Sequence, residues 1–205
     1  MSLLYLASQS PIRHQLLREA HIPFQVITQE IDEEAYGLSS NVDERVVQIA
    51  QAKMNHVIVP AGTHEGQLCW IATADSLVQG GNGDIVGKPS SREHAVQMLK
   101  MLRAAPCRVV TGLCCERRRW NGTAWILEQE HCQAVGAQVE VHISDFWIDI
   151  YLDKHPYALQ TAGVLVVEGH GAQFVKSITG SYTAVMGLPM YELREALEKL
   201  GFFAE

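Results

Sequence analysis

The amino-acid sequence predicts an α/β protein with a mixed sheet, and three observations support that prediction. Short apolar runs bounded by turn residues alternate with helical periodicity at both ends of the chain. Between them lies a long alternating stretch with an Asn-Gly turn, a pattern typical of antiparallel strands. Hydrophobic residues make up 47% of the 205 positions and charged residues 19%, which excludes a disordered chain. Because we find no repeat or linker, we expect residues 1–205 to form a single domain.

The first part of the chain is expected to alternate strands and helices. The apolar run Leu3–Ala7 predicts a strand, and Ser10-Pro11 then supplies an N-cap and a proline for the first turn of a helix. Phe24–Thr28 predicts a second strand, followed by an acidic loop. Ser40 and Asp43 have capping-box spacing and predict the start of the next helix. The inward stripe of that helix is Val46, Ile49, Ala50, Lys53 and Val57.

The middle of the chain begins with a buried strand and ends with long antiparallel strands. Cys69–Val78 is an apolar run of strand length, and Gly80–Asp84 is a turn. Ser90 or Ser91 then caps a helix with apolar positions Ala95, Met98, Leu99 and Leu102. Residues 108–141 alternate around Asn121-Gly122, which indicates a β-hairpin or meander.

Three shorter elements complete the prediction. Ser144–Leu152 is expected to form a short helix or turn, and Val164–Glu168 a strand. Pro189–Leu200 is expected to be a terminal helix that ends at Gly201.

Charge excludes one class of partner. The chain carries 16 basic and 23 acidic side chains, a formal charge of −7. Binding to a nucleic-acid backbone needs clustered Lys and Arg, so we expect no nucleic-acid partner. The basic run Arg117-Arg118-Arg119 adjoins the predicted hairpin turn and is interpreted as a solvated tip. Small anions remain possible ligands, because a few local cations and backbone amides can hold them.

Cysteine usage and the N-terminus predict a cytoplasmic protein. The five cysteines are odd in number and include no C-x-x-C, so we expect neither a zinc site nor a disulfide framework. No basic region precedes an apolar stretch at the N-terminus, which argues against a signal peptide. No apolar run approaches the roughly 20 residues that span a bilayer, so no membrane contact is predicted.

Several familiar motifs fail on inspection. The stretch Gly83-x-x-x-Gly87-Lys88-Pro89 has one residue too few between its glycines for a P-loop, and Pro89 stands where Ser or Thr is needed. Gly81-Asn82-Gly83 lacks the third glycine of a dinucleotide fingerprint. The sequence contains no G-x-S-x-G and no H-E-x-x-H, and its nine histidines are scattered. ATPase, dehydrogenase, hydrolase-elbow and zincin interpretations are therefore excluded.

Two charged residues fall where an apolar residue is expected. Asp75 lies in or just after an apolar strand, where an unpaired buried carboxylate costs several kcal/mol. It either caps the next turn or lies at a ligand site, since ligands favour the carboxyl ends of such strands. Lys53 lies on the apolar stripe of its helix. Its amine either reaches water or meets a phosphate in a cleft.

Three further segments could hold anions or a metal. Ser8 to Arg13 joins a strand to a helix N-terminus, where free N–H groups favour anions and Arg13 adds a planar fork. The acidic cluster Asp32-Glu33-Glu34 offers oxygen ligands for Mg²⁺, and Lys88 is a rigidly placed cation. Each segment also has an ordinary structural interpretation. Together they indicate metal-assisted cleavage of a phosphoanhydride.

These residues fall in motifs that resemble those of the Maf family, septum-formation-inhibitor proteins that act as nucleotide pyrophosphatases. The resemblance spans nearly the whole chain in collinear order. Its motifs are Leu6-Ala7-Ser8-Gln9-Ser10-Pro11-Ile12-Arg13, Ile31-Asp32-Glu33, Ala50-x-x-Lys53, Ala74-Asp75-Ser76, Gly87-Lys88-Pro89, Thr111-Gly112, Ala162-Gly163, Glu168-Gly169 and Gly180-Ser181-Tyr182-x-x-Val185-x-Gly187-Leu188-Pro189.

The resemblance implies a fold and an activity. The fold would be an elongated, two-lobed α/β structure similar to inosine-triphosphate pyrophosphatases, with the nucleotide in a cleft between the lobes. The reaction would convert a nucleoside triphosphate to the monophosphate and pyrophosphate, with Mg²⁺ or Mn²⁺, in a cytoplasmic homodimer.

The resemblance also implies roles for individual residues. Asp75 would activate water and help Glu33 hold the metal. The residues implied to grip the phosphates are Ser8, Arg13, Lys53 and Lys88.

Some positions depart from the family pattern. Three of them, Ile12, Ser76 and Glu168, are positions that the family uses to choose the base. Glu168 resembles the branch that acts on 7-methyl-GTP, which favours a modified purine triphosphate; the alternative is dTTP or UTP. Thr161 and Cys107 replace a Lys and a His of the pattern.

Two other classes of function compete with an enzyme. A catalytically quiet nucleotide-binding regulator of cell division would not need Asp75 as a water-activating carboxylate. A structural interaction protein would leave the placement of the cations and carboxylates unexplained.

Overall fold

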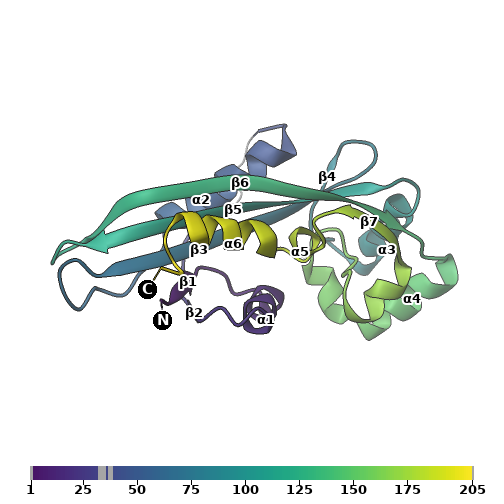
Figure 1. The fold of residues 1–205 in the computed structure, drawn as a ribbon. Coiled ribbons are helices and arrows are strands. Elements are labelled where there is room, and N and C mark those ends of the chain that lie inside the picture. The colour runs from purple at the N-terminus through teal and green to yellow at the C-terminus, as the bar shows by residue number, and fades with distance from the viewer. Residues whose placement is uncertain (1, 32–35, 37–38, 205) are drawn as a thin grey trace. The chain divides into compact units, whose positions relative to one another are not determined.

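The computed structural model describes residues 2–31, 36 and 39–204, which form a seven-stranded mixed sheet with helices (Figure 1). The α/β prediction is therefore confirmed. The strands are β1 (Leu4–Leu6), β2 (Phe24–Val26), β3 (Leu68–Gln79), β4 (Ile85–Val86), β5 (Cys107–Trp120), β6 (Trp125–Val141) and β7 (Val175–Gly180). The helices are α1 (Pro11–Glu19), α2 (Val42–Asn55), α3 (Arg92–Leu102), α4 (Asp145–Lys154), α5 (Tyr182–Val185) and α6 (Met190–Lys199), with 3₁₀ turns η2 (Pro156–Gln160) and η3 (Gly169–Phe174).

The sheet combines parallel and antiparallel pairs. Its strand order is β2-β1-β3-β5-β6-β7, with β4 paired to β3. β1 runs parallel to both β2 and β3, so Leu4 lies opposite Phe24 on one side and Trp70 on the other. β3–β4 and β6–β7 are antiparallel. The parallel part places the carboxyl ends of β1 and β3 at one edge, where α/β sheets bind ligands.

The chain forms two compact units. The first comprises Met1–Asp75, Thr111–Val135 and Gly187–Glu205, and the second comprises Ser76–Val110 and Gly136–Met186. Three strands, β3, β5 and β6, contribute residues to both units. Each unit is therefore assembled from separate stretches of chain.

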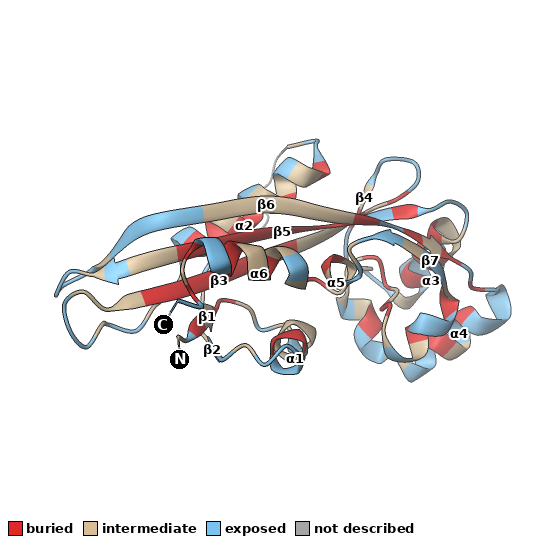
Figure 2. Ribbon diagram, in the orientation of Figure 1, coloured by how far each residue is buried: buried red, intermediate tan, exposed pale blue. Residues whose placement is uncertain are grey.

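The core of the first unit packs α2 onto the sheet. One cluster of buried residues joins β1, β3, β5 and α2, and buried positions follow one another along β3 and β5 (Figure 2). Its members include Ala7, Ala50, Met54, Ile71 and Cys114. Gly112 of β5 allows the close approach, because a Cβ atom there would overlap the backbone of Val46 in α2.

The core of the second unit is built around Tyr151, which is fully buried. Its hydroxyl donates to the Val164 carbonyl at 3.0 Å and accepts from the Val166 amide at 3.0 Å. Burial raises the pKa of Tyr151 to about 12, so the hydroxyl stays neutral. The same cluster contains buried residues of α3, α4, β5 and β6, among them Leu99, Val109, Val139 and Ile148.

Helix starts follow the predictions with one exception. Ser10, Ser91 and Ser144 precede α1, α3 and α4 as N-caps. The cap of α2 is Asn41 rather than the predicted Ser40, and its side chain accepts from the Asp43 amide at 2.9 Å. Asn and Ser are comparable caps, so spacing alone did not separate these neighbours. Val57, predicted on the α2 stripe, lies beyond the helix end.

The predicted strand Val164–Glu168 is wrong. Gly163 and Val164 have φ angles of +74° and +63°, a left-handed conformation that a β-strand cannot contain. The segment is a loop, and the Tyr151 hydroxyl satisfies two of its backbone groups. Strand β7, which the sequence did not predict, pairs with the end of β6.

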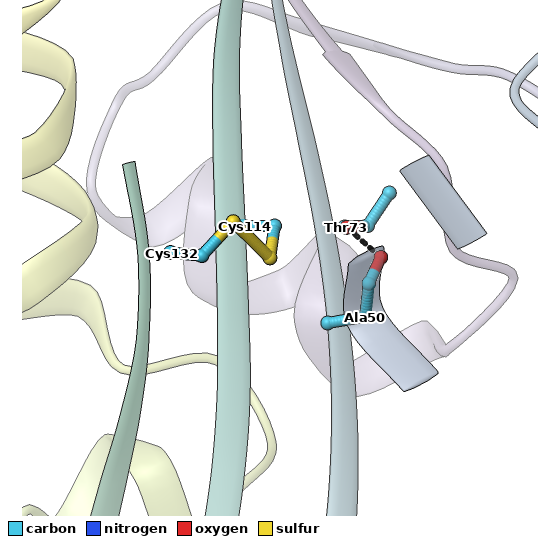
Figure 3. Close-up of a disulfide and its surroundings, with 4 residues drawn as sticks. All are labelled: Ala50, Thr73, Cys114 and Cys132. Carbon is cyan, nitrogen blue, oxygen red and sulfur yellow. Dashed lines mark hydrogen bonds between the residues drawn. A yellow bond between two sulfur atoms is a disulfide. The ribbon is translucent and has the colours of Figure 1, made fainter. Parts of the chain in front are cut away.

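The expectation about cysteines is also wrong, because Cys114 of β5 and Cys132 of β6 form a disulfide (Figure 3). An odd count without a C-x-x-C motif gave no sign of this pair. Cys69, Cys107 and Cys115 are free and buried. Burial raises the pKa of Cys115 to about 12 and that of Cys69 to about 11, which makes both thiols inert. Among the described helices, none has the length and apolar character needed to cross a membrane.

Candidate active site

Lys53 and Asp75, the two charged residues that the sequence places at apolar positions, form one buried ion pair. Lys53 Nζ lies 2.7 Å from Asp75 Oδ1, and the two side chains are 9% and 10% exposed. Lys53 comes from the last turn of α2, and Asp75 from the middle of β3. Pairing removes the cost of an isolated charge in each position. Neither side chain is therefore a solvated surface charge.

Local contacts fix the helix and the strand that supply this pair. The Thr73 hydroxyl of β3 donates to the Ala50 carbonyl of α2 at 2.8 Å, two residues before Asp75 and three before Lys53 (Figure 3). Thr73 is fully buried, so this bond is shielded from water. Gly112 lets β5 approach the first half of the same helix. The pair is thus placed by backbone packing rather than by flexible loops.

The turn between β1 and α1 is held by Arg13. Arg13 Nε donates to the Gly187 carbonyl at 2.6 Å. Nη1 donates to Ser8 Oγ at 3.0 Å and to the Ala74 carbonyl at 2.9 Å. The resemblance predicted a phosphate-binding fork here, and the structure directs these donors at the chain itself.

The same turn presents donors to an anion. Ser8 Oγ accepts from Arg13 and from the Ser10 amide at 3.3 Å, and neither contact uses its own proton. Ser10 makes no side-chain cap, so the first amides of α1 are not satisfied by that residue. His14 Nε2 lies 2.7 Å from the Ser8 carbonyl and must donate to it. His14 was not among the predicted site residues, although it directly follows Arg13 in the sequence.

Three predicted site residues belong to the second unit. Ser76 is half-buried in β3, and Lys88 is exposed in the loop after β4. Glu168 immediately precedes η3 and is half-buried. Burial raises the pKa of Glu168, which favours its neutral carboxylic acid. Ile12, the remaining specificity position, is half-buried on α1 in the first unit.

The predicted metal site is only partly described. Glu33 and its neighbours Asp32 and Glu34 lie outside the residues that the structure describes. Within the described ranges, no group of three or more His, Cys, Asp or Glu side chains is arranged to hold a metal. Asp75 fits in kind, because carboxylate oxygens are the ligands that Mg²⁺ takes, and Lys53 Nζ donates to one of its two oxygens, Oδ1.

One cavity of the second unit lies apart from these residues. It has a volume of about 500 Å³, and its lining includes Arg103, His142, Trp147 and Phe174. None of the predicted site residues lines it. We therefore place the candidate site at the charged and polar residues around Asp75 and not at this cavity.

The chain is similar to known proteins over almost its whole length. A dTTP/UTP pyrophosphatase of Idiomarina loihiensis is 35% identical over 95% of this chain and 93% of its own. Proteins of the same description from Caldicellulosiruptor bescii and Halalkalibacterium halodurans are each 34% identical over 98% of this chain, and over 96% and 98% of their own lengths. The descriptions of these three relatives name dTTP and UTP and do not name 7-methyl-GTP.

The structural likeness is weaker. A solved HAM1 protein from Coxiella burnetii matches 69% of this chain and 74% of its own, with 15% identity and a TM-score of 0.32, which is too distant to inform the site. The family model described as Maf-like protein matches residues 3–200. The chain therefore belongs to the Maf family.

Proposed function

We propose that this protein is a nucleoside triphosphate pyrophosphatase that converts dTTP and UTP to the monophosphate and pyrophosphate. The observation that supports it most directly is the buried Lys53–Asp75 pair at 2.7 Å. A pure binding protein has no need of a carboxylate kept inside the fold by a lysine. Membership of the Maf family, together with relatives described as dTTP/UTP pyrophosphatases, supports the proposed substrate class.

Asp75 is proposed as the general base. Lys53 contacts Oδ1 and fixes the orientation of the carboxylate, so Oδ2 can accept a proton from water. The activated water attacks either the α- or the β-phosphorus atom and gives its proton to Asp75. A P–O bond forms between that phosphorus and the water oxygen, and the bond from the same phosphorus to the bridging oxygen breaks. The bridging oxygen leaves with pyrophosphate after attack at the α-phosphorus, or with the nucleoside monophosphate after attack at the β-phosphorus.

The phosphates are proposed to meet three kinds of donor. The Ser8 hydroxyl and the first amides of α1 offer neutral hydrogen bonds at a positive helix end. Lys53 and Lys88 supply positive charge. A divalent metal held by Asp75 together with Glu33 would neutralise further phosphate charge when bound. Water exclusion around Asp75, which is 7% exposed, strengthens these interactions.

Substrate choice is proposed to involve Ile12, Ser76 and Glu168. Burial raises the pKa of Glu168, and in its protonated form this side chain has one O–H donor and one carbonyl acceptor, the same kinds of group that a glutamine amide offers. Such a group can pair with the polar edge of uracil or thymine. Glu168→Gln is expected to keep dTTP and UTP turnover and to lower any turnover of purine triphosphates. An unchanged substrate ranking would remove Glu168 from base selection.

A panel of triphosphates tests the reaction. The protein is incubated with dTTP, UTP, GTP and 7-methyl-GTP plus Mg²⁺ or Mn²⁺, and pyrophosphate and phosphate are assayed separately. Pyrophosphate from dTTP and UTP is expected. Phosphate alone would show stepwise phosphatase action instead, and no turnover of any substrate would favour the binding-only alternative.

Size-exclusion chromatography of the same sample tests the homodimer that the family resemblance implies.

The role of Asp75 is tested by Asp75→Asn. Loss of a general base should lower kcat by at least about 10²-fold. The matched control is Asp84→Asn, which changes an exposed turn aspartate whose Oδ2 accepts from the Asn82 side chain. Thermal unfolding of both variants confirms that they are folded. Near-normal turnover of Asp75→Asn would remove this residue from the mechanism.

A further inference from the structure

The Arg13 side chain joins three separate segments of the first unit. Its hydrogen bonds reach Ser8 in the turn after β1, Ala74 beside Asp75 in β3, and Gly187 ahead of α6. The three donor–acceptor distances are 2.6, 2.9 and 3.0 Å, and the side chain is half-buried. Contacts that span 174 residues in sequence cannot arise from local helix structure.

Donor geometry separates two roles for this arginine. A guanidinium that binds phosphate bidentately presents two parallel N–H groups to two oxygens of one group. Here Nε donates to one backbone carbonyl, and the two N–H groups of Nη1 donate to another carbonyl and to a hydroxyl. Gly187 and Ala74 are buried, so both carbonyls would lose a partner that water cannot easily replace.

We propose that Arg13 is a positioning residue, which fixes the β3 segment carrying Asp75 against the Ser8 turn. The contact with Ala74 acts on the peptide unit next to Asp75. Lys53 holds the Asp75 carboxylate from the side of α2, so backbone and side chain are restrained from two directions. The same guanidinium draws the Ser8 hydroxyl toward this strand. The catalytic consequence rests on the proposed function, while the contact itself does not.

Loss of this restraint is expected to affect turnover more than binding. A displacement of a reacting group by about 1 Å can lower a rate by about 10²-fold. Arg13→Gln should therefore lower kcat by about that factor, with KM for dTTP and inhibition by inorganic pyrophosphate changed less than about twofold. Arg13→Lys should behave similarly, because one ammonium cannot present a planar fork to three acceptors.

Arg18→Gln is the matched control for these kinetics. Arg18 lies on the same helix, is exposed, and packs over the Phe24 ring at 5.8 Å. Its loss should leave kcat, KM and inhibition unchanged. A tenfold or larger rise in KM and in the pyrophosphate inhibition constant, with kcat preserved in Arg13→Lys or Arg13→Gln, would overturn the positioning role and restore the phosphate-binding one.

A second measurement needs no activity. Thermal unfolding is followed for Ser8→Ala, Arg13→Gln and the double variant, with Arg18→Gln combined with Ser8→Ala as the control cycle. Because Ser8 and Arg13 share a bond, the shift of the double variant should be smaller than the sum of the two single shifts. The control cycle should be additive.

The two measurements separate the proposals. Additive shifts for Ser8 and Arg13 would show that the contact carries no stability and would overturn the inference. If the wild type turns over no triphosphate while the Ser8–Arg13 cycle is non-additive, the proposed function fails and the structural role of Arg13 remains. If Arg13→Gln does not fold, the cycle is repeated with Arg13→Lys, for which the same outcome decides.

Discussion

At the scale of single residues, the Lys53–Asp75 pair couples stability to the site. Both side chains are about nine-tenths buried, so removing one partner leaves an uncompensated charge in the interior. Lys53→Met should therefore lower the free energy of unfolding by about 3–5 kcal/mol. Adding Asp75→Asn removes the unpaired carboxylate charge and should restore much of the lost free energy of unfolding. Urea unfolding of the two single variants and the double variant measures these free energies.

An exposed pair provides the contrast for this cycle. Arg194 and Glu198 lie four residues apart on α6, and their side chains are 42% and 52% exposed. Such pairs contribute about 0.3–0.5 kcal/mol, so Arg194→Met should cost far less than Lys53→Met. If the Lys53 and Asp75 variants were as mild and additive as the surface ones, the pair would not be desolvated in solution.

Glu168 should make stability depend on pH. Its pKa is raised by burial, so the folded state holds the proton more tightly than the unfolded chain, whose pKa is near 4.5. Between that value and the raised one, the folded state binds more protons, and the free energy of unfolding falls as pH rises. Glu168→Gln removes this term. Urea unfolding at intervals from pH 4 to pH 7 should show a shallower decline in the variant.

The comparison isolates one carboxyl group. Burial also raises the pKa of Glu116, which produces a slope of the same sign, but Glu116 is present in both proteins and cancels in the difference. Parallel stability curves for wild type and Glu168→Gln would show that Glu168 is solvated and ionised like an ordinary surface glutamate.

At the scale of elements, the disulfide joins β5 and β6 next to the packing of α2. Cys114 and Cys132 are 18 residues apart, and closing a loop of that length contributes about 3 kcal/mol in the chain-entropy model. Cys132→Ser should therefore lower the thermal midpoint by several degrees, and a dithiol reductant should lower the wild type to the same value. Cys115→Ser is the control for replacing a cysteine: reductant should still lower its midpoint. A wild-type midpoint insensitive to reductant would show that the two thiols are unpaired in solution.

Helix α2 also depends on a glycine of β5. A methyl group at position 112 would overlap the carbonyl of Val46, which is backbone and cannot rotate away. Gly112→Ala should cost about 3 kcal/mol as an overpacked core and should lower turnover, because α2 carries Lys53. Gly87→Ala is the stability control, since a Cβ atom there meets nothing within 4 Å. Equal unfolding midpoints for the two variants would mean that β5 and α2 are packed less closely than described.

At the scale of the whole molecule, the sequence predicted features with a local signal and missed those without one. Periodicity located α2, β3 and the β5–β6 hairpin, and two misplaced charges identified Lys53 and Asp75 as candidates. The sequence could not show that Lys53 and Asp75 form one ion pair, because their contact depends on tertiary packing. The bonds of Arg13 to two carbonyls had no signal in side-chain identities. The strand prediction for Val164–Glu168 was wrong because the backbone at Gly163 and Val164 has positive φ angles, which the apolar sequence pattern does not reveal.

The distribution of charge over the whole molecule predicts that the protein does not bind nucleic acids. Its formal charge is −7, and the basic run Arg117–Arg119 is its most concentrated positive stretch. In the structure each of these arginines contacts a carboxylate: Arg117 and Arg119 both pair with Glu128, and Arg118 pairs with Glu116. The run therefore offers little uncompensated charge to a phosphate backbone.

Binding to a nucleic acid should consequently fail even at modest salt. Non-specific binders reach dissociation constants of about 10⁻⁴–10⁻⁶ M at physiological salt by releasing counterions from several phosphates, and affinity then falls steeply as salt rises. Fluorescence anisotropy with a labelled 20-nucleotide single strand should show no saturation up to about 100 μM protein at either 50 or 150 mM salt. The variant Glu128→Gln is the informative comparison, because it frees two arginines without touching the candidate site. Salt-dependent binding by Glu128→Gln alone would show that the carboxylate masks the run. Binding by the wild type would contradict the prediction and mean that the charge pairs open in solution.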